Sequence, residues 1–312
     1  MPEPFTATVP VALQGVAKTY GGTPVLEGVS LSVAAGESLV LVGHNGAGKT
    51  TLMKLLLGLV RPSAGQVRVF GEDPTTASSV VRRGSLGYLP ESIAFDDAMT
   101  GRELLRFYAG LKGVNGSASD ELLVRVGVDD AADRRISTWS KGMRQRLGLA
   151  QAMLGRPRIL LLDEPTSGLD PSLRSTLYEI IETLRADGVT VLISSHALNE
   201  VEAHADRVAI LRQGRLLACG TLAELSAQAA LPVRLRLACE SQATARVAGQ
   251  FDKRLAVDHF DAEHIELECP HADKMAVLRE IADLGETIVD VDLRLPQLDD
   301  IYAHFMAPDR PS

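Results

Sequence analysis

The stretch SLVLVGHNGAGKTTLMKLLLGLV, residues 38–60, decides the fold. A continuous apolar run opens it, a glycine-rich loop follows, and apolar residues at helical spacing close it. Gly43, Gly48, Lys49 and Thr50 satisfy the pattern G-x-x-x-x-G-K-[ST] between a predicted strand and a predicted helix. This flanking context favours a phosphate-binding loop (P-loop) over a glycine-rich turn without a ligand.

The composition of the loop explains how it would hold phosphate. Its glycines allow backbone N–H groups to wrap around the anion, and the start of the following helix adds a positive dipole. Lys49 would reach the terminal phosphates, and the Thr50 hydroxyl would bind Mg²⁺. The residues expected to contact the ligand are Gly43, His44, Asn45, Gly46, Ala47, Gly48, Lys49, Thr50 and Thr51.

A second buried strand, RILLLDEP at residues 158–165, ends in two carboxylates. Asp163 can hold Mg²⁺ through water at the end of such a strand. Neighbouring strand residues point to opposite faces, but a turn at the strand's end would leave Glu164 free to polarise an attacking water. A helix at 173–188 and a third strand at 189–196 follow. This alternation of strand and helix predicts a parallel sheet with helices on its faces.

The sequence divides into two predicted domains, 1–221 and 222–312. The first is expected to be an α/β domain of the P-loop NTPase class, with a parallel-sheet core and an antiparallel β lobe. Helical periodicity without a convincing strand predicts a helical insert at about 92–155. The second domain has the order β-α-β-β-α-β, typical of a small ferredoxin-like α/β domain, and closes with a helix around 298–306.

The composition excludes several classes of protein. With 46% hydrophobic and 23% charged residues among 312, the chain is expected to be globular. A net charge of -8 and a pI near 5.4 argue against nucleic acid as a partner. Three scattered cysteines predict a reducing compartment. No stretch approaches ~18 apolar residues and the start lacks a basic signal region, so any membrane partner would be another chain.

Further motifs follow a fixed order around the P-loop. SKGMRQ at 140–145 resembles the signature motif LSGGQ-x-QR of ABC ATPases, and SGLD at 167–170 resembles their D-loop. His196 follows a strand as the H-switch histidine does, and Tyr20 precedes the P-loop like the aromatic residue of the A-loop. Each motif alone is weak. In this order they identify residues about 11–220 as a member of the ABC ATPase family.

The resemblance implies ATP and Mg²⁺ as ligands, with Lys49, Glu164 and His196 as catalytic residues. Tyr20 would stack on adenine. Glu91 stands where the family has the Q-loop glutamine, as in one branch of ABC subunits, and a loop glutamate in solvent is the alternative. The implied Mg²⁺ ligands are Thr50, Asp163 and Glu91. The implied nucleotide-contacting residues of the signature motif and D-loop are Ser140, Lys141, Gly142, Met143 and Asp170.

In the family, the signature motif of one subunit caps the nucleotide held by the other, so the resemblance implies a homodimer. It also implies a separate polytopic membrane permease, with a periplasmic component as a further candidate, and no nucleic-acid partner. The chain would then be a peripheral protein on the cytoplasmic face of the inner membrane. ABC ATPases that act on DNA or ribosomes have coiled-coil inserts or two ATPase halves, and this sequence has neither.

The motifs GHNGAGKT, GYLPES and WSKGM, with the ending LPQLDDIYAHFM, resemble the NosF branch of the family. That branch implies a role in copper-site maturation of nitrous oxide reductase. The alternatives are the ATPase of an ABC-2 type drug or polysaccharide exporter, and a soluble ABC ATPase without a transport role. Copper-type ligands are scattered over the second domain, and only Cys269 and His271 lie close together in sequence. Because a single close pair is weak evidence for a metal site, we expect that domain to be structural.

Overall fold

The chain forms two compact units, Met1–Cys219 and Gly220–Ser312. The computed structural model describes residues 9–76, 84–240, 243–252, 254–259 and 261–307. Residues 1–8 and 308–312, at the start of the first predicted domain and the end of the second, lie outside the described residues, as do residues 241–242 of the second domain.

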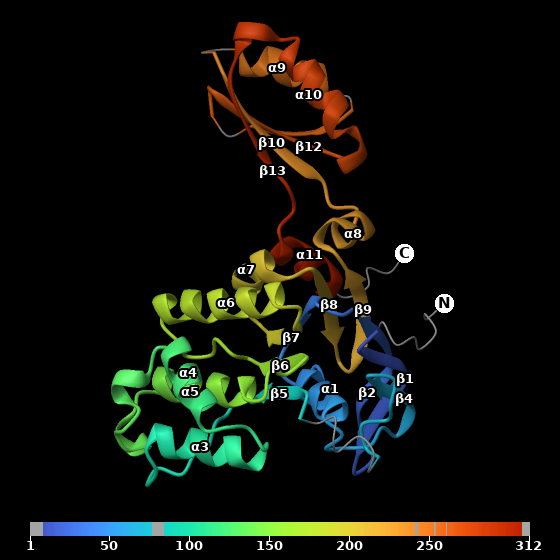
Figure 1. Ribbon diagram of the computed structural model, residues 1–312. Helices are drawn as coiled ribbons and strands as arrows, with labels where there is room; N and C mark the ends of the chain where they lie inside the picture. The colour runs from blue at the N-terminus through green and yellow to red at the C-terminus, as the bar shows by residue number, and fades with distance from the viewer. Residues whose placement is uncertain (1–8, 77–83, 241–242, 253, 260, 308–312) are drawn as a thin grey trace. The chain divides into compact units, whose positions relative to one another are not determined.

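A six-stranded sheet forms the core of the first unit (Figure 1). Its strands are β3 (Ser38–Val42), β5 (Leu86–Leu89), β6 (Ile159–Asp163), β7 (Thr190–Ser195), β8 (Arg207–Arg212) and β9 (Arg215–Gly220). Their order is β5-β6-β7-β3-β8-β9, and the pairs from β5 to β8 are parallel, which confirms the predicted parallel core. Every residue of β3, β6 and β7 is buried, as expected for continuously apolar strands in a parallel sheet.

Three antiparallel strands form a β lobe with the order β2-β1-β4. They are β1 (Val11–Tyr20), β2 (Thr23–Val33) and β4 (Ala64–Val69). Val11 pairs with Val33 on one side and with Val69 on the other. These buried side chains belong to a hydrophobic cluster shared with α1 (Lys49–Leu56), the helix that follows the P-loop. The lobe is therefore fixed to the phosphate-binding loop by apolar packing.

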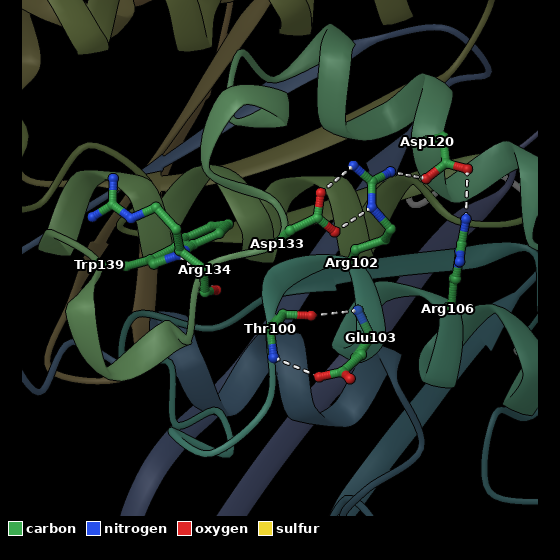
Figure 2. A network of polar contacts seen from close by, with 8 residues as sticks. All are labelled: Thr100, Arg102, Glu103, Arg106, Asp120, Asp133, Arg134 and Trp139. Atoms are coloured by element: carbon green, nitrogen blue, oxygen red, sulfur yellow. Dashed lines mark hydrogen bonds and ion pairs between the residues drawn. The ribbon is translucent and has the colours of Figure 1, made fainter.

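The segment between β5 and β6 is built mainly of three helices that pack on one another. They are α3 (Gly101–Leu111), α4 (Ser117–Arg125) and α5 (Lys141–Met153), while α6 (Pro171–Ala186) and the short α7 (Leu198–Val201) follow β6 and β7. A capping box starts α3: the Glu103 N–H donates to Thr100 Oγ1 (3.2 Å) and the Thr100 N–H donates to Glu103 Oε2 (2.9 Å) (Figure 2). Both bonds satisfy N–H groups that a helix start leaves unpaired.

One arginine ties this helical segment together. The Arg102 guanidinium on α3 donates through Nε to Asp133 (2.7 Å) and also binds Asp120 on α4 (Figure 2). Asp120 accepts a second bond from Arg106 (2.9 Å). The same region is closely packed, because a Cβ atom at Gly101 would lie 2.4 Å from the Trp139 ring. Polar and apolar contacts thus both hold the start of α3.

The second unit contains a four-stranded antiparallel sheet. In chain order its elements are α8 (Leu222–Gln228), β10 (Val233–Cys239), α9 (Thr244–Phe251), β11 (Ala256–His259), β12 (His264–Cys269), α10 (Lys274–Ala282), β13 (Ile288–Arg294) and α11 (Leu298–Met306). The sheet order is β11-β12-β10-β13, with each neighbouring pair antiparallel. Helices α9 and α10 lie together on one side of it (Figure 1). This confirms the predicted ferredoxin-like order.

The core of the second unit contains two of the three cysteines. Cys239 and Cys269 lie among apolar side chains from β10, β12, α9 and α10. Burial raises the pKa of both thiols, so both are held in the neutral form. The described residues contain no cluster of three His, Cys, Asp or Glu side chains that could hold a metal ion. They also contain no helix long and apolar enough to cross a membrane.

Candidate nucleotide site

A cavity opens at the carboxyl ends of β3 and β6, two parallel strands that β7 separates in the sheet. Its lining comes from the P-loop, from the end of β6 and from the loop after β5. The lining residues are Val25, His44, Asn45, Gly46, Ala47, Gly48, Lys49, Thr50, Thr51, Glu91, Asp163 and Glu164. The structure therefore brings most of the predicted phosphate and metal contacts into one place.

Two glycines of the P-loop occupy positions where a side chain would not fit. A Cβ atom at Gly43 would lie 2.5 Å from the backbone oxygen of Leu211, and one at Gly48 would lie 2.5 Å from a methyl carbon of Leu26. Gly48 also has a φ of 105° and is the N-cap of α1, whose first turn contains no acidic residue. The unpaired N–H groups at the start of such a helix bind anions.

Lys49 is the buried cation of the cavity. Its side chain is 7% exposed, and Nζ donates to the Gly43 oxygen at 2.6 Å. Nζ also lies 3.3 Å from Glu164 Oε1, an ion pair without the alignment of a hydrogen bond, since that oxygen has no hydrogen-bond partner. A buried oxygen without a hydrogen bond is uncommon and can accept one from a ligand or a water.

The end of β6 places its two carboxylates with the help of Ser194 on β7. Ser194 Oγ donates to Asp163 Oδ1 at 2.6 Å and accepts the Glu164 N–H at 2.9 Å. Glu164 has a φ of 48°, the left-handed region that residues other than glycine seldom adopt. This turn is how two successive residues both line one cavity instead of pointing to opposite faces of the strand.

Glu164 also contacts His196 at the end of β7. His196 Nδ1 lies 2.7 Å from Glu164 Oε2, and the imidazole is 63% exposed while the carboxylate is 8% exposed. Glu164 thus lies between a buried lysine and an exposed histidine. The arrangement suits a carboxylate that orients or deprotonates a water beside a bound phosphate.

Two residues beside the carboxylates of the cavity could not be predicted from the sequence. Ser194 was not predicted, because a serine within the buried strand VLISS carries no motif. Tyr88 on β5 was not predicted either, and burial, followed by the nearby charges of Asp163 and Glu91, raises its pKa to about 12. Glu91 itself is exposed and lines the cavity.

The oxygen donors at the cavity fit Mg²⁺. The Thr50 hydroxyl and the Asp163 carboxylate are hard oxygen ligands of the kind that Mg²⁺ prefers. Asp163 is 1% exposed and its Oδ1 accepts the Ser194 bond, so its position is fixed. Two protein donors leave most of an octahedral shell to phosphate oxygens and water. The set therefore suits a metal ion that arrives with a nucleotide.

Tyr20 lies outside the set of residues that line the cavity. It ends β1 in the tight turn to β2, and 43% of its surface is exposed. Lys18 Nζ lies 4.7 Å from the centre of its ring. An exposed ring on the same lobe as Val25 can stack on a flat ligand, but the cavity as shaped here does not include it.

The signature residues 140–143 also lie outside this cavity. Ser140 is the N-cap of α5 and accepts the Met143 N–H at 3.2 Å. Gln145 Nε2 donates to the Pro165 oxygen at 3.1 Å, which links α5 to the segment after Glu164. The start of α5 is thus an ordered helix N-terminus connected to the segment that follows β6 in its own chain, and it does not line the P-loop cavity.

The D-loop residue Asp170 is a helix cap. Its carboxylate accepts the Leu173 N–H at 3.0 Å and the Ser172 hydroxyl at 2.7 Å at the start of α6. The Ser172 bond, then the Leu173 bond, lowers the pKa of Asp170 below its usual value. Nearby, a Cβ atom at Gly168 would lie 2.2 Å from Lys141 Nζ, so the signature lysine lies against the D-loop.

A P-loop between a buried parallel strand and a helix, with acidic residues at the end of a second strand of the same sheet, defines a P-loop nucleoside triphosphatase. Residues 26–167 match a family model described as "ABC transporter". The daunorubicin resistance ATP-binding protein DrrA3 of Streptomyces coeruleorubidus is 33% identical over 97% of this chain and 98% of its own length. The chain belongs to the ABC transporter ATP-binding family and is an ATPase of that family.

Other similar proteins are also ATP-binding proteins or subunits. The daunorubicin/doxorubicin resistance ATP-binding protein DrrA of Streptomyces peucetius is 35% identical over 94% of this chain and 91% of its own. The Nod factor export ATP-binding protein I of Rhizobium sp. (strain N33) is 39% identical over 68% and 71%. A solved ATP-binding subunit of an ABC transporter is 30% identical, with a TM-score of 0.65 over 70% of this chain and 92% of that one. These names favour the exporter alternative and give no support to the NosF branch.

Proposed function

We propose that this chain is the ATPase subunit of an ABC-2 type exporter. It would drive a separate membrane-spanning permease from the cytoplasmic face of the inner membrane. The observation that carries the proposal is the likeness to two drug-resistance ATP-binding proteins over 97% and 94% of the chain. That likeness includes the second unit as well as the ATPase unit, whereas a match to the ATPase unit alone would fit any ABC subunit.

The geometry explains how the chain would hold ATP. Phosphate oxygens would bind the N–H groups of the P-loop and compete with Glu164 for the Lys49 ammonium, which is now 3.3 Å from that carboxylate. Mg²⁺ held by Thr50 and Asp163 would neutralise phosphate charge. Glu91 would stand beside the same charges, and Tyr20 would stack on the adenine ring.

Glu164 would then act on the attacking water. Its Oε1 has no hydrogen-bond partner in the structure, so it can accept one from a water once Lys49 has turned to phosphate. His196, 2.7 Å from Oε2, would keep the carboxylate in place and contact the terminal phosphate. The charge that develops on the phosphoryl group would be stabilised by Lys49 and the P-loop donors.

We propose that two copies complete each site. The residues 140–143 start a helix but do not line the cavity of their own chain, so their N–H groups and dipole remain for another copy's nucleotide. Asp170, at the start of α6, would lie at the same contact between copies. ATP bound at the interface would join the copies, and hydrolysis would release them.

Transport measurements test the exporter proposal. Expression of this chain with a candidate ABC-2 permease, in drug-sensitive cells, should lower the accumulation of daunorubicin. The same pair with Lys49→Ala should not, while Lys54→Ala, an exposed change on the same helix, should behave like the natural sequence. Equal accumulation with the natural chain and with Lys49→Ala would contradict export of this class of drug.

The copper-maturation branch predicts a different result. Loss of this coding sequence would then lower the copper content of nitrous oxide reductase and leave drug accumulation unchanged. That outcome would replace the exporter proposal, although the chain would remain an ABC ATPase. A co-purified polytopic membrane protein is expected in either case, so co-purification alone does not decide between them.

A further inference from the structure

The sheet of the second unit has one long strand that is paired along one side. β13 is last in the order β11-β12-β10-β13, and within the described ranges it pairs with β10 alone (Figure 1). A free strand edge presents N–H and C=O groups that can pair with another chain. Near the two ends of this strand, Val289 is 68% exposed and Leu295 is 48% exposed. The unpaired edge of β13 and the exposed apolar side chains near its ends together indicate a site where another strand can pair.

The register shows which backbone groups face outward. The Cys239 N–H donates to a backbone oxygen on the β12 side of β10, at 2.7 Å. Because N–H directions alternate along a strand, Arg236 faces β13, where its partner is Asp292. The residues on either side of Asp292 therefore face away from β10. Val291 and Leu293 present the outward N–H and C=O groups of this edge.

We propose that β13 pairs antiparallel with β13 of a second copy about a twofold axis at Leu293. An axis at Asp290, Asp292 or Arg294 would place a charged residue opposite itself. An axis at Val291 would place Asp290 opposite Asp292 twice. Within 290–294, the axis at Leu293 is the one that places opposite charges together without a like pair, since Asp292 of each copy then faces Arg294 of the other. An axis at Asp292 would pair Asp290 with Arg294 but would also set Asp292 against itself.

The same axis matches the apolar residues. Leu293 faces Leu293 of the second copy, and Val291 faces Leu295, which is 48% exposed in one copy. The backbone N–H and C=O groups of Leu293 and Val291 face away from β10, so these residues form the hydrogen-bonded pairs of the new ladder. Asp292 and Arg294 then form the non-hydrogen-bonded pair, whose Cα atoms approach to about 4.5 Å and bring the two charges together.

The charges around Arg294 favour a second copy. Within the chain Arg294 lies opposite Arg234, a like charge that is itself paired with Glu268 at 3.0 Å. Arg294 Nε donates to Asp292 Oδ2 of its own strand at 2.9 Å. Pairing would add the Asp292 carboxylate of the second copy on the outer side of Arg294. The Val291 N–H donates to its neighbour's side chain at 2.8 Å, so that bond would be exchanged for one to the second copy.

Charge reversal in the full chain, studied without nucleotide, tests the pairing. Arg294→Asp places Asp292 opposite an aspartate in both pairs, so the dimer dissociation constant from sedimentation should rise roughly tenfold or more. It also removes the like charge opposite Arg234, so folding should be kept. The double change Asp292→Arg with Arg294→Asp restores opposite charges and should restore association. Asp258→Arg, on the other edge strand, is the matched control.

Cysteine substitution tests the axis. Residues on a twofold axis face their own copies about 5.5 Å apart between Cα atoms, within the range that a disulfide spans. Under mild oxidation Leu293→Cys should therefore form a covalent dimer, whereas Val291→Cys and Leu295→Cys should not exceed the background of the natural chain. Linking through residue 291 would place the axis elsewhere and overturn the proposal.

The pairing does not rest on the proposed transport role. It predicts association without ATP, whereas the composite site predicts association that depends on ATP, so each can fail alone. A natural chain that stays monomeric without nucleotide at about 100 µM, or an Arg294→Asp variant that associates as the natural chain does, would overturn it. Restored association in the double variant, together with linking at residue 293, would support it.

Discussion

The buried Lys49 ammonium has two partners, one held by a hydrogen bond and one by a looser ion pair. It donates to the Gly43 oxygen at 2.6 Å, and it faces the Glu164 carboxylate at 3.3 Å in a looser ion pair. A buried charge is costly without a partner, and the looser contact is the one that a phosphate would replace. We therefore expect Lys49 to exchange its ion pair with Glu164 for a contact with phosphate when a nucleotide binds.

Replacement of Lys49 should weaken nucleotide binding. Lys49→Ala removes a charge-assisted bond worth about 1.5–3 kcal/mol, so affinity for ATP should fall roughly 10- to 100-fold. Equilibrium binding of a fluorescent ATP analogue measures this, with Lys54→Ala as the control on the exposed face of α1. Unchanged affinity would mean that Lys49 does not contact phosphate.

Replacement of Glu164 should separate binding from hydrolysis. Glu164→Gln keeps the size of the side chain but removes its ability to accept a proton, so hydrolysis should slow roughly 10²- to 10⁴-fold while ATP still binds. Phosphate release at saturating ATP is the measurement. Glu179→Gln, an exposed change on α6, should hydrolyse normally. Near-normal turnover of the Glu164 variant would exclude Glu164 as the group that acts on water.

The sequence predicted residues that line the cavity better than residues beside them. Lys49 and Asp163 could be predicted because motif and strand position are both local in sequence. Ser194 and Tyr88 could not, since their roles come from the parallel pairing of β6 with β7 and of β5 with β6. Nothing local in the sequence shows that the Ser194 hydroxyl lies 2.6 Å from Asp163.

At the scale of elements, the start of α3 shows how local signals hold the helical segment. Thr100 and Glu103 form the capping box, and Arg102 connects α3 to α4 and to Asp133 (Figure 2). These contacts are exposed, so each contributes modestly. Their concentration at one helix start makes that start a sensitive place for substitution.

Loss of the cap should lower stability. Thr100→Ala removes the acceptor for the Glu103 N–H and should reduce the free energy of unfolding by about 1 kcal/mol. Urea denaturation followed by circular dichroism measures the change. Thr100→Ser keeps the hydroxyl and should remain within experimental error of the natural chain. If both variants unfold alike, the hydroxyl does not act as the cap.

The arginine network should make stability depend on acid pH. Arg102 holds the pKa of Asp133 below its usual value, and Arg106 followed by Arg102 does the same for Asp120. A lowered pKa gives stability that is present above the usual aspartate pKa and lost as pH falls through the folded value. The unfolding temperature of Arg102→Met should therefore lie below that of the natural chain at pH 7.

That difference should shrink as the pH falls below the usual aspartate pKa and through the lowered pKa values of the two carboxylates. Arg246→Met is the control, because Arg246 bonds the Thr287 hydroxyl and should give a difference that does not shrink with acid. A gap for Arg102→Met that stays constant from pH 7 to pH 3 would show that the ion pairs are not its cause.

Strands with a continuous apolar run were predictable from the sequence, whereas strands that are very short or largely exposed were not. The strands β3, β6 and β7 are continuously apolar, and the ferredoxin-like order appears in the pattern of the second unit. β4 reads AGQVRV with three exposed residues, and β5 has four residues, so neither has a pattern strong enough to predict. Both exist because of pairing with distant strands, β1 and β6.

In the molecule as a whole, the P-loop and the residues 140–143 of the ATPase unit do not line one cavity. The P-loop cavity contains Lys49 and Glu164, while Ser140 starts a helix outside it. Full-length likeness to drug-resistance ATP-binding proteins accompanies this arrangement. We infer that hydrolysis needs the P-loop of one copy and the signature residues 140–143 of another.

Mixing two defective variants tests that claim most directly. Lys49→Ala disables the P-loop, and Ser140→Glu places a negative charge where the second copy's phosphate should bind, so neither variant alone should hydrolyse ATP at more than a few per cent of the natural rate. Random pairing in an equal mixture makes about half of the dimers mixed, each with one intact composite site. The mixture should therefore regain about a quarter of the natural hydrolysis rate. A mixture no faster than the sum of its two components would contradict the account.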